Sequence, residues 1–243
     1  MSLTFCTFKW KAYTGYRSTF ESEHVNVLFR MIDRHYTAPH RNICVTDDAV
    51  GISGTIETVP LWKDHADVPN PNGGTRNPSC YRRLKLFAPD AAKTLGISEG
   101  GTVVVMDLDT VIVGDLTGLF ARSEDFVIWG QTDYPRTQWY NGSLWMLRTG
   151  TRPKVWTEFH PQTSPTMASK AGKKGSDQGW FSYVLGPNEA VWTTKDGVYS
   201  WRVHLSKMNW ELPADAKIVS FHGHTDPWSY QAQQISWVRA HWN

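Results

Sequence analysis

The stretch Gly101-Thr102-Val103-Val104-Val105-Met106-Asp107-Leu108-Asp109 decides how this chain of 243 residues is interpreted. Its first six residues form a continuous, mostly β-branched run, which is typical of a strand covered on both faces in a mainly parallel sheet. The run ends in two acids separated by one residue. Because side chains at i and i+2 of a strand point to the same side, we expect Asp107 and Asp109 to converge on one point.

Two carboxylates held close together repel each other unless a cation lies between them. Carboxylate oxygens with open water positions suit Mn²⁺ or Mg²⁺ bound jointly with substrate phosphates. The alternative is that Asp107 and Asp109 are two exposed acids in a turn or at a helix cap. His222 is a candidate third ligand and His224 competes with it, although a histidine in such a place is also explained as a hydrogen-bonded structural residue.

Outward from this stretch, hydrophobic periodicity predicts an alternation of strands and helices. The predicted strands are 3–10, 41–46, 55–61, 101–106, 126–130, 143–148 and 218–221. The predicted helices are 22–35, 80–87 and 177–185. This alternation predicts an α/β fold with a central, mostly parallel sheet flanked by helices, formed as a single domain over residues 1–243.

Charge and composition exclude several classes of protein. The chain has 25 basic and 23 acidic residues, a net charge of +2, which is too balanced for a protein that coats nucleic acid or an anionic membrane. Its three cysteines are widely spaced and form no metal-binding pair, which fits a reducing compartment. No secretory signal and no transmembrane segment is apparent, so we expect a cytoplasmic location.

Each of the remaining candidate residues can be explained either by a functional role or by a purely structural one. Arg83 offers a planar fork of donors to a phosphate, whereas Arg82 is interpreted as facing solvent. Asp177-Gln178 opens a predicted helix, where an acid also serves as a simple cap. Asn141 precedes Gly142-Ser143, where a turn would be an adequate explanation.

Taken together, five motifs in order resemble the glycosyltransferases of family 8, which include glycogenin and bacterial lipooligosaccharide galactosyltransferases. They are Tyr81-Arg82-Arg83-Leu84, Val103 to Val113 around Asp107-Leu108-Asp109, Tyr140-Asn141-Gly142-Ser143, Asp177-Gln178, and His222-Gly223-His224-Thr225-Asp226-Pro227-Trp228. Phe8-Lys9-Trp10 and Cys44-Val45-Thr46-Asp47-Asp48 also look like a bacterial subgroup of such enzymes.

The resemblance implies a GT-A type fold with a Rossmann-like nucleotide-binding domain. It implies a hexosyltransferase-like enzyme that uses a nucleoside diphosphate sugar, usually UDP-linked, with Mn²⁺ or Mg²⁺, and transfers the sugar with retention. It implies donor or cofactor binding by Lys9, Trp10, Asp47, Arg83, Asp107, Leu108 and Asp109. It further implies metal ligation by Asp107, Asp109 and His222, and places Asn141, Asp177 and Gln178 around the donor sugar and the reacting centre.

The chain departs from the family pattern at two positions. Ser220 occupies the place of the usual histidine before Gly223, and Asp226 replaces the lysine that usually precedes Pro-Trp. The acceptor, whether glycan, lipid or protein, is not specified by the sequence. Candidate acceptor loops are 64–79, 133–140 and 160–175.

Two other functions are compatible with parts of the sequence. Asp-Leu-Asp-Thr also fits the aspartyl-nucleophile phosphatases, but there the motif ends the first strand of the core domain, and here about a hundred residues precede it. A non-catalytic protein that binds nucleotide sugars is the second alternative, because Ser220 and Asp226 depart from the enzyme pattern.

Overall fold

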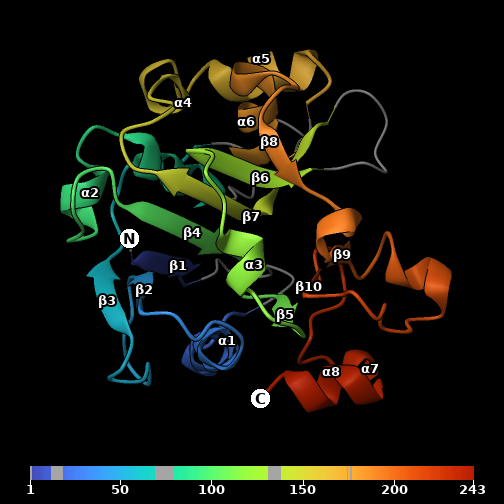
Figure 1. Cartoon of the computed structure of the whole chain (residues 1–243). Helices are drawn as coiled ribbons and strands as arrows, with labels where there is room; N and C mark the ends of the chain where they lie inside the picture. Colours follow the sequence, from blue (N-terminus) through green and yellow to red (C-terminus); the bar gives the residue numbers. More distant parts are fainter. Residues whose placement is uncertain (1, 12–18, 69–78, 131–137, 174, 176) are drawn as a thin grey trace. The chain divides into compact units, whose positions relative to one another are not determined.

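The computed structural model describes residues 2–11, 19–68, 79–130, 138–173, 175 and 177–243 of the chain (Figure 1). The strands are β1 (Leu3–Lys9), β2 (His40–Thr46), β3 (Glu57–Pro60), β4 (Thr102–Met106), β5 (Thr110–Ile112), β6 (Phe126–Gly130), β7 (Tyr140–Arg148), β8 (Ala190–Trp192), β9 (Val198–Ser200) and β10 (Ile218–Ser220). The α-helices are α1 (Ser22–His35), α2 (Ala91–Thr94), α3 (Thr117–Phe120), α4 (Lys154–Thr157), α5 (Ser164–Lys170), α6 (Asp177–Leu185), α7 (Tyr230–Gln233) and α8 (Ser236–His241). Shorter-pitch 3-10 helices are η1 (Ser79–Phe87), η2 (Thr194–Asp196) and η3 (Leu205–Met208).

Seven strands form a central sheet in the order β3-β2-β1-β4-β7-β6-β8, and three form a second sheet in the order β5-β10-β9. Strand β1 pairs in parallel with β2, and β2 pairs in parallel with β3, whereas β6 and β7 are antiparallel. The predicted α/β fold with a mostly parallel central sheet is therefore confirmed, with an antiparallel pair within it.

The chain divides into two compact units, which we name by their place in the sequence. The mid-chain unit comprises residues 61–103 and 124–191, and the terminal unit comprises residues 2–60, 104–123 and 192–243. That residues 1–243 form one domain stays a prediction.

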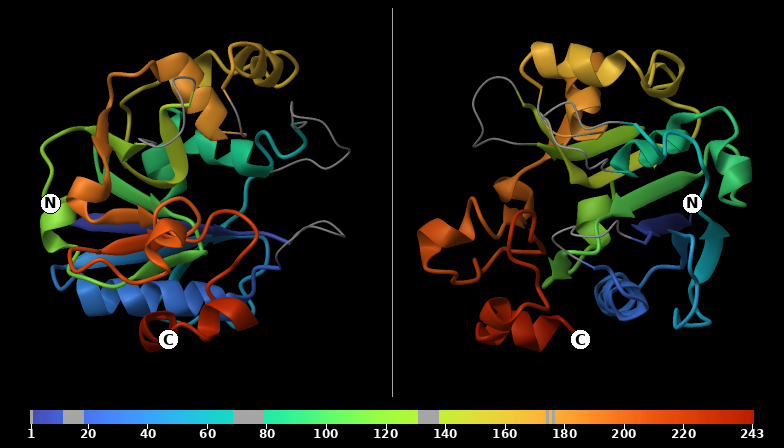
Figure 2. Two further views of the ribbon diagram at one scale, coloured as in Figure 1. Left: turned by 90° about the vertical axis from the view of Figure 1, so that its right-hand side faces the viewer. Right: turned by 180° about the vertical axis from the view of Figure 1, so that it is seen from behind.

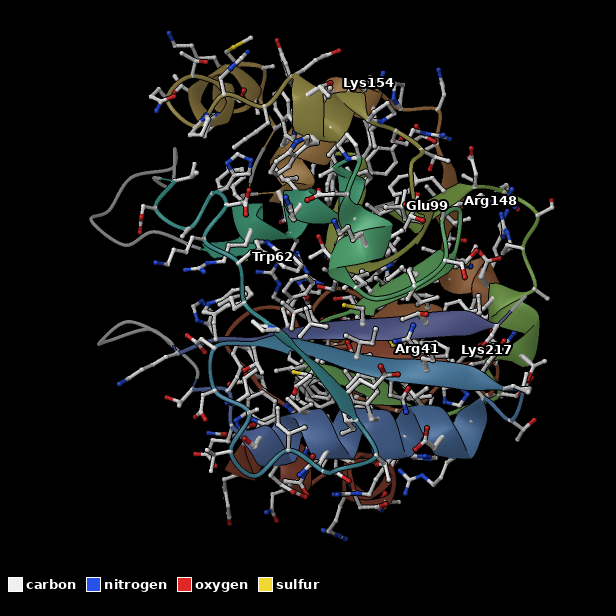
Figure 3. The ribbon with its side chains drawn as sticks, turned by 90° about the vertical axis from the view of Figure 1, so that its left-hand side faces the viewer. Arg41, Trp62, Glu99, Arg148, Lys154 and Lys217 are labelled. Atoms are coloured by element: carbon white, nitrogen blue, oxygen red, sulfur yellow. The ribbon has the colours of Figure 1, made fainter. Side chains whose placement is uncertain are left out.

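In the terminal unit, α1 covers the parallel strands that begin the chain (Figure 3). Its residues Val25, Leu28, Phe29 and Ile32 are buried, as the predicted helical face requires. The helix begins where the Glu21 backbone N–H donates to His24 Nδ1 at 3.0 Å. Figure 2 shows α7 and α8 beside α1, where stacked and tilted aromatic rings join the end of the chain to the helix.

In the mid-chain unit, α4, α5 and α6 lie together on one side of β6 and β7 (Figure 1). The two strands pair from Phe126↔Leu147 to Gly130↔Tyr140. The core beneath them is aromatic: the rings of Phe87 and Trp145 stack with centroids 5.2 Å apart, and Phe181 packs against both. Large buried rings of this kind contribute much of the apolar area that stabilises a core.

Most predicted elements are present, and the differences have local causes. The helices over 22–35 and 177–185 and the strand over 126–130 have the predicted bounds. The predicted helix over 80–87 is a 3-10 helix. Strand β7 begins at Tyr140 rather than at residue 143, because Gly130 and Trp129 of β6 pair with Tyr140 and Asn141. No helix in the described part of the chain is long and apolar enough to cross a membrane.

Candidate functional site

The Asp107-Leu108-Asp109 segment links β4 to β5 in the terminal unit. Strand β4 ends at Met106 and β5 begins at Thr110, so the two acids lie in a short turn rather than on the strand itself. The prediction that Asp107 and Asp109 lie on one face of a strand is therefore wrong. Asp109 is buried and Asp107 is half-buried, so the alternative of two exposed acids is wrong for Asp109.

Strand pairing brings the segment after β10 to this turn. Strand β10 pairs with β5 in antiparallel register, with Ser220 opposite Thr110. One residue further, the Phe221 backbone N–H donates to the Asp109 carbonyl at 2.8 Å. His222 follows directly, so its backbone lies beside the turn, whereas Ser220 lies opposite Thr110, which follows the turn.

His222 is held by a serine from β9. Its Nε2 lies 2.7 Å from Ser200 Oγ, which also accepts a hydrogen bond from the Val203 backbone N–H at 3.0 Å. Strand β9 pairs in parallel with β10, with Ser200 opposite Ser220, which sets this contact. A partner on one ring nitrogen fixes the orientation of an imidazole and is typical of histidines that ligate a metal through the other nitrogen. His224 is exposed.

The donor chemistry of this segment fits a hard divalent cation, since two carboxylates lie in one three-residue turn with an imidazole on the adjoining chain. Within the described ranges, however, no three His, Cys, Asp or Glu side chains are grouped so that they could hold a metal ion. Ligation by Asp107, Asp109 and His222 therefore stays a prediction.

The predicted donor-binding residues at the start of the chain lie at the carboxyl ends of β1 and β2. Lys9 is buried, and its ammonium donates to the Asp48 carbonyl at 2.7 Å and lies 3.6 Å from the Asp48 carboxylate. The Val50 backbone N–H and the charge of Lys9 lower the pKa of Asp48. Asp47 is exposed and accepts from the Lys11 backbone N–H. The structure thus pairs Lys9 with Asp48, which the sequence did not single out.

Trp10 ends this segment and packs edge-on against Phe8 at 6.3 Å between ring centroids. The carboxyl ends of parallel strands are the usual place for a ligand in an open α/β sheet. A role for Lys9, Trp10, Asp47 and Leu108 in donor binding stays a prediction.

In the mid-chain unit, Arg83 and Asp177 form a buried ion pair. Arg83 Nε and Nη2 both lie 2.6 Å from Asp177 Oδ2, and the two side chains are 6% and 2% exposed. Asp177 Oδ1 accepts from the Gln178 backbone N–H at the start of α6, where a negative charge is favoured by the helix dipole. The capping interpretation of Asp177 is compatible with this contact, but the acid also neutralises an arginine.

Asn141 and Gln178 lie close to this ion pair, and each accepts a hydrogen bond from the backbone of residues 142–143. The Gly142 N–H donates to Gln178 Oε1 at 3.2 Å, and Asn141 Oδ1 accepts from the Ser143 N–H at 2.8 Å. A Cβ on Gly142 would lie 2.9 Å from Arg83 Nη2, so only glycine allows this close approach. The structure therefore brings together Arg83, Asn141, Asp177 and Gln178, which we name the polar cluster.

The prediction that Arg82 faces solvent is wrong. Arg82 is half-buried, and its Nη1 donates to the Trp62 carbonyl at 2.9 Å. Trp62 Nε1 returns a hydrogen bond to the Arg82 carbonyl at 2.7 Å. The reason is that η1 turns adjacent arginines in different directions, one to Trp62 and one to Asp177.

Two further residues, Gln138 and Ser200, contact the candidate site residues but were not predicted from the sequence. Gln138 is buried and its Nε2 donates to the carbonyls of Tyr140 and Gln178. Ser200 reaches His222 across 22 residues of sequence. Neither lies in a recognisable motif, because both contacts arise from tertiary pairing alone. Most of the predicted acceptor loops 64–79 and 133–140 lies outside the described residues.

No family model and no curated protein sequence matches the chain. Solved structures of glycosyltransferases do share its fold, and the predicted GT-A fold class is thereby confirmed. An active-site mutant of LgtC matches with a TM-score of 0.64 at 12% identity, over 98% of this chain and 93% of that chain. The galactosyltransferase LgtC in complex with donor and acceptor sugar analogs gives 0.59 at 12% identity, over 98% and 93%. The apo-form glycosyltransferase GlyE of Streptococcus pneumoniae TIGR4 gives 0.56 at 12% identity, over 98% and 61%.

Proposed function

We propose that this chain is a metal-dependent glycosyltransferase that takes its sugar from a nucleoside diphosphate sugar, with UDP as the expected nucleotide. The observation that carries the proposal is the β5–β10 pairing, which brings His222 to the turn that holds Asp107 and Asp109, in a chain with the GT-A fold. Two acids and an imidazole are suited to a cation that is shared with a diphosphate.

In this proposal Asp107, Asp109 and His222 hold Mn²⁺ or Mg²⁺. When bound, such a cation offsets the negative charge that builds on a departing diphosphate. Ser200 orients the His222 ring through Nε2, at the distance of a normal hydrogen bond. The phosphatase alternative is less suitable, because β1, β2 and β3 precede β4 and the acidic turn that follows it.

The polar cluster is proposed to bind sugar hydroxyls and not to act as a nucleophile. Both Asp177 oxygens accept hydrogen bonds, Oδ2 from Arg83 and Oδ1 from the Gln178 N–H. Hydrogen bonding to a carboxylate stabilises its charged form and lowers its tendency to attack. This arrangement supports retention by a front-face transfer, for which no protein nucleophile is needed.

The test is metal-dependent hydrolysis of UDP-sugars in the absence of an acceptor. Asp107→Ala and Asp109→Ala are expected to reduce this hydrolysis by at least about 100-fold, the scale of losing one electrostatic stabiliser. Glu99→Ala is the control, because Glu99 is an exposed acid (Figure 3). Near-normal turnover of either Asp variant contradicts the metal assignment. Calorimetric UDP binding without hydrolysis or transfer by the unmodified protein would favour the non-catalytic binding protein instead.

A further inference from the structure

Lys173 is a buried cation that has no acidic partner among the residues that the structure describes. It is 7% exposed, and within the described part of the chain its ammonium contacts only the ring of Trp139, with Nζ 3.1 Å from the ring centroid. Burial lowers the pKa of Lys173. An ammonium that is largely shielded from water is stabilised by an anion, and the described residues place no carboxylate within salt-bridge distance of Lys173.

Two other lysines that are shielded from solvent, Lys85 and Lys9, each lie close to a carboxylate. Lys85 also lies over a tryptophan ring, that of Trp156 at 5.1 Å, but its ammonium is 3.0 Å from the Asp90 carboxylate. Lys9 is 3.6 Å from the carboxylate of Asp48. A cation–π contact with one ring face does not replace the carboxylate that Lys85 and Lys9 each have nearby.

The position of Lys173 is fixed by the end of α5. Gly172 has a φ of 76°, and its N–H donates to the Ser169 carbonyl at 2.9 Å. The Lys173 N–H then donates to the Ala168 carbonyl at 2.9 Å. These two bonds define a Schellman motif, which holds the residue after the glycine in one backbone conformation.

The position of Trp139 is fixed equally well. Its neighbour Gln138 is buried and bonds to the carbonyls of Tyr140 and Gln178, which ties the segment to β7 and α6. Trp139 itself is half-buried, so part of its ring remains open to solvent. Trp139 and Lys173 belong to two of the stretches that the sequence predicts to bind the acceptor, 133–140 and 160–175. Their contact brings these two residues together.

From this contact we propose that Lys173 and Trp139 form a subsite of the mid-chain unit for a sugar that carries an anionic group, either a carboxylate or a phosphate. The open part of the ring offers apolar surface to the C–H face of a sugar, and the ammonium offers its N–H groups to the anion. This inference rests on the proposed function, because it describes the acceptor of that reaction.

The experiment compares three probes that differ only in the group at C6: glucose, which is neutral, glucuronate, which carries a carboxylate, and glucose 6-phosphate, which carries a phosphate. Binding to the full chain is measured by ligand-observed NMR and calorimetry. We expect at least one anionic probe to bind about 10-fold more tightly than glucose, and Lys173→Met to abolish this preference. Lys173→Arg is expected to retain it. Lys170→Met is the matched control, because Lys170 is an exposed lysine of the same helix end.

Preference for glucuronate alone supports a carboxylate ligand, and preference for glucose 6-phosphate alone supports a phosphate. Equal binding of all three probes overturns the proposal, as does a preference that survives Lys173→Met. A loss of UDP affinity in Lys173→Met, measured without any sugar probe, also overturns it, since Lys173 would then serve the donor.

A second measurement does not depend on how the variants fold. Reductive methylation with ¹³C labels each lysine amine of the unmodified protein, and the anionic probe is expected to shift the Lys173 signal and leave the Lys170 signal in place. No shift at Lys173 contradicts the subsite. Hydrolysis of UDP-sugars is measured separately, so failure of the donor reaction is distinguished from failure of anion binding.

Discussion

Two buried carboxylates, Asp177 and Asp109, lie in different units and beside different residues. Asp177 lies in the mid-chain unit, where Arg83 bonds to it at 2.6 Å. Asp109 lies in the terminal unit, in a turn that holds a second acid, Asp107, two residues away. The first carboxylate is neutralised by its own unit and stabilises the fold. The second lies two residues from another acid, and we propose that these two acids bind a cation.

The largest expected effect comes from removing Arg83. Arg83→Met leaves the Asp177 charge buried without its partner, which we expect to lower the free energy of unfolding by about 3–5 kcal/mol. Denaturation in urea measures this. Arg148→Met, at an exposed arginine of β7 (Figure 3), is the control and should change stability by less than about 0.5 kcal/mol.

The double variant Arg83→Met/Asp177→Leu sharpens the comparison. It removes both charges, so much of the lost stability is expected to return. If Arg83→Met alone costs less than about 1 kcal/mol, the pair does not stabilise the unit as described.

The second effect concerns the acidic turn. Mn²⁺ at about 100 times its dissociation constant should stabilise the unmodified protein by about 2.7 kcal/mol through mass action. Asp107→Asn and Asp109→Asn should lose this gain, which a thermal-shift measurement with and without Mn²⁺ detects. An equal shift in Glu99→Gln and in the two Asp variants would indicate that the metal binds elsewhere.

A third effect tests the close packing of the polar cluster. Gly142→Ala places a methyl carbon 2.9 Å from Arg83 Nη2, which is too close unless the arginine side chain shifts. We expect a loss of about 1–3 kcal/mol, the usual cost of overpacking. Gly118→Ala is the control, since a Cβ there meets nothing within 4 Å. Equal free energies of unfolding for Gly142→Ala and Gly118→Ala would show that the polar cluster accommodates the added methyl group without loss of stability.

The smallest effect appears in alkaline solution. Burial raises the pKa of Tyr81, and the negative charge of Asp177 raises it further. Below pH 10 the tyrosine is protonated in both folded and unfolded chains, so its contribution to stability is fully present. Above pH 10 the unfolded chain releases the proton first, and stability falls by about 1.4 kcal/mol per pH unit until the folded pKa is reached.

Tyr81→Phe is expected to remove this part of the alkaline loss. Denaturation midpoints between pH 9 and 11 measure it, with Tyr230→Phe, at an exposed tyrosine, as the control. An unchanged pH dependence in Tyr81→Phe would assign the alkaline loss to other groups.

Local sequence patterns determined much of the fold. The period of 3.6 residues over 22–35 and the apolar run over 102–106 specify their elements because each buries a face that the pattern itself marks. Strands β5, β8 and β9 were not predicted. Each has three residues, too few to show a period, and depends on a neighbouring strand for its hydrogen bonds.

The same division holds for the candidate sites. The sequence by itself identified the two acids after the apolar run, because residue type and order carry that information, and the family resemblance favoured Arg83 over Arg82. Only the tertiary structure joined Arg83 to Asp177 across 94 residues, His222 to Ser200, and Lys173 to Trp139. Such contacts depend on strand register and helix ends that bring distant segments together, and no local pattern encodes a partner so far along the chain.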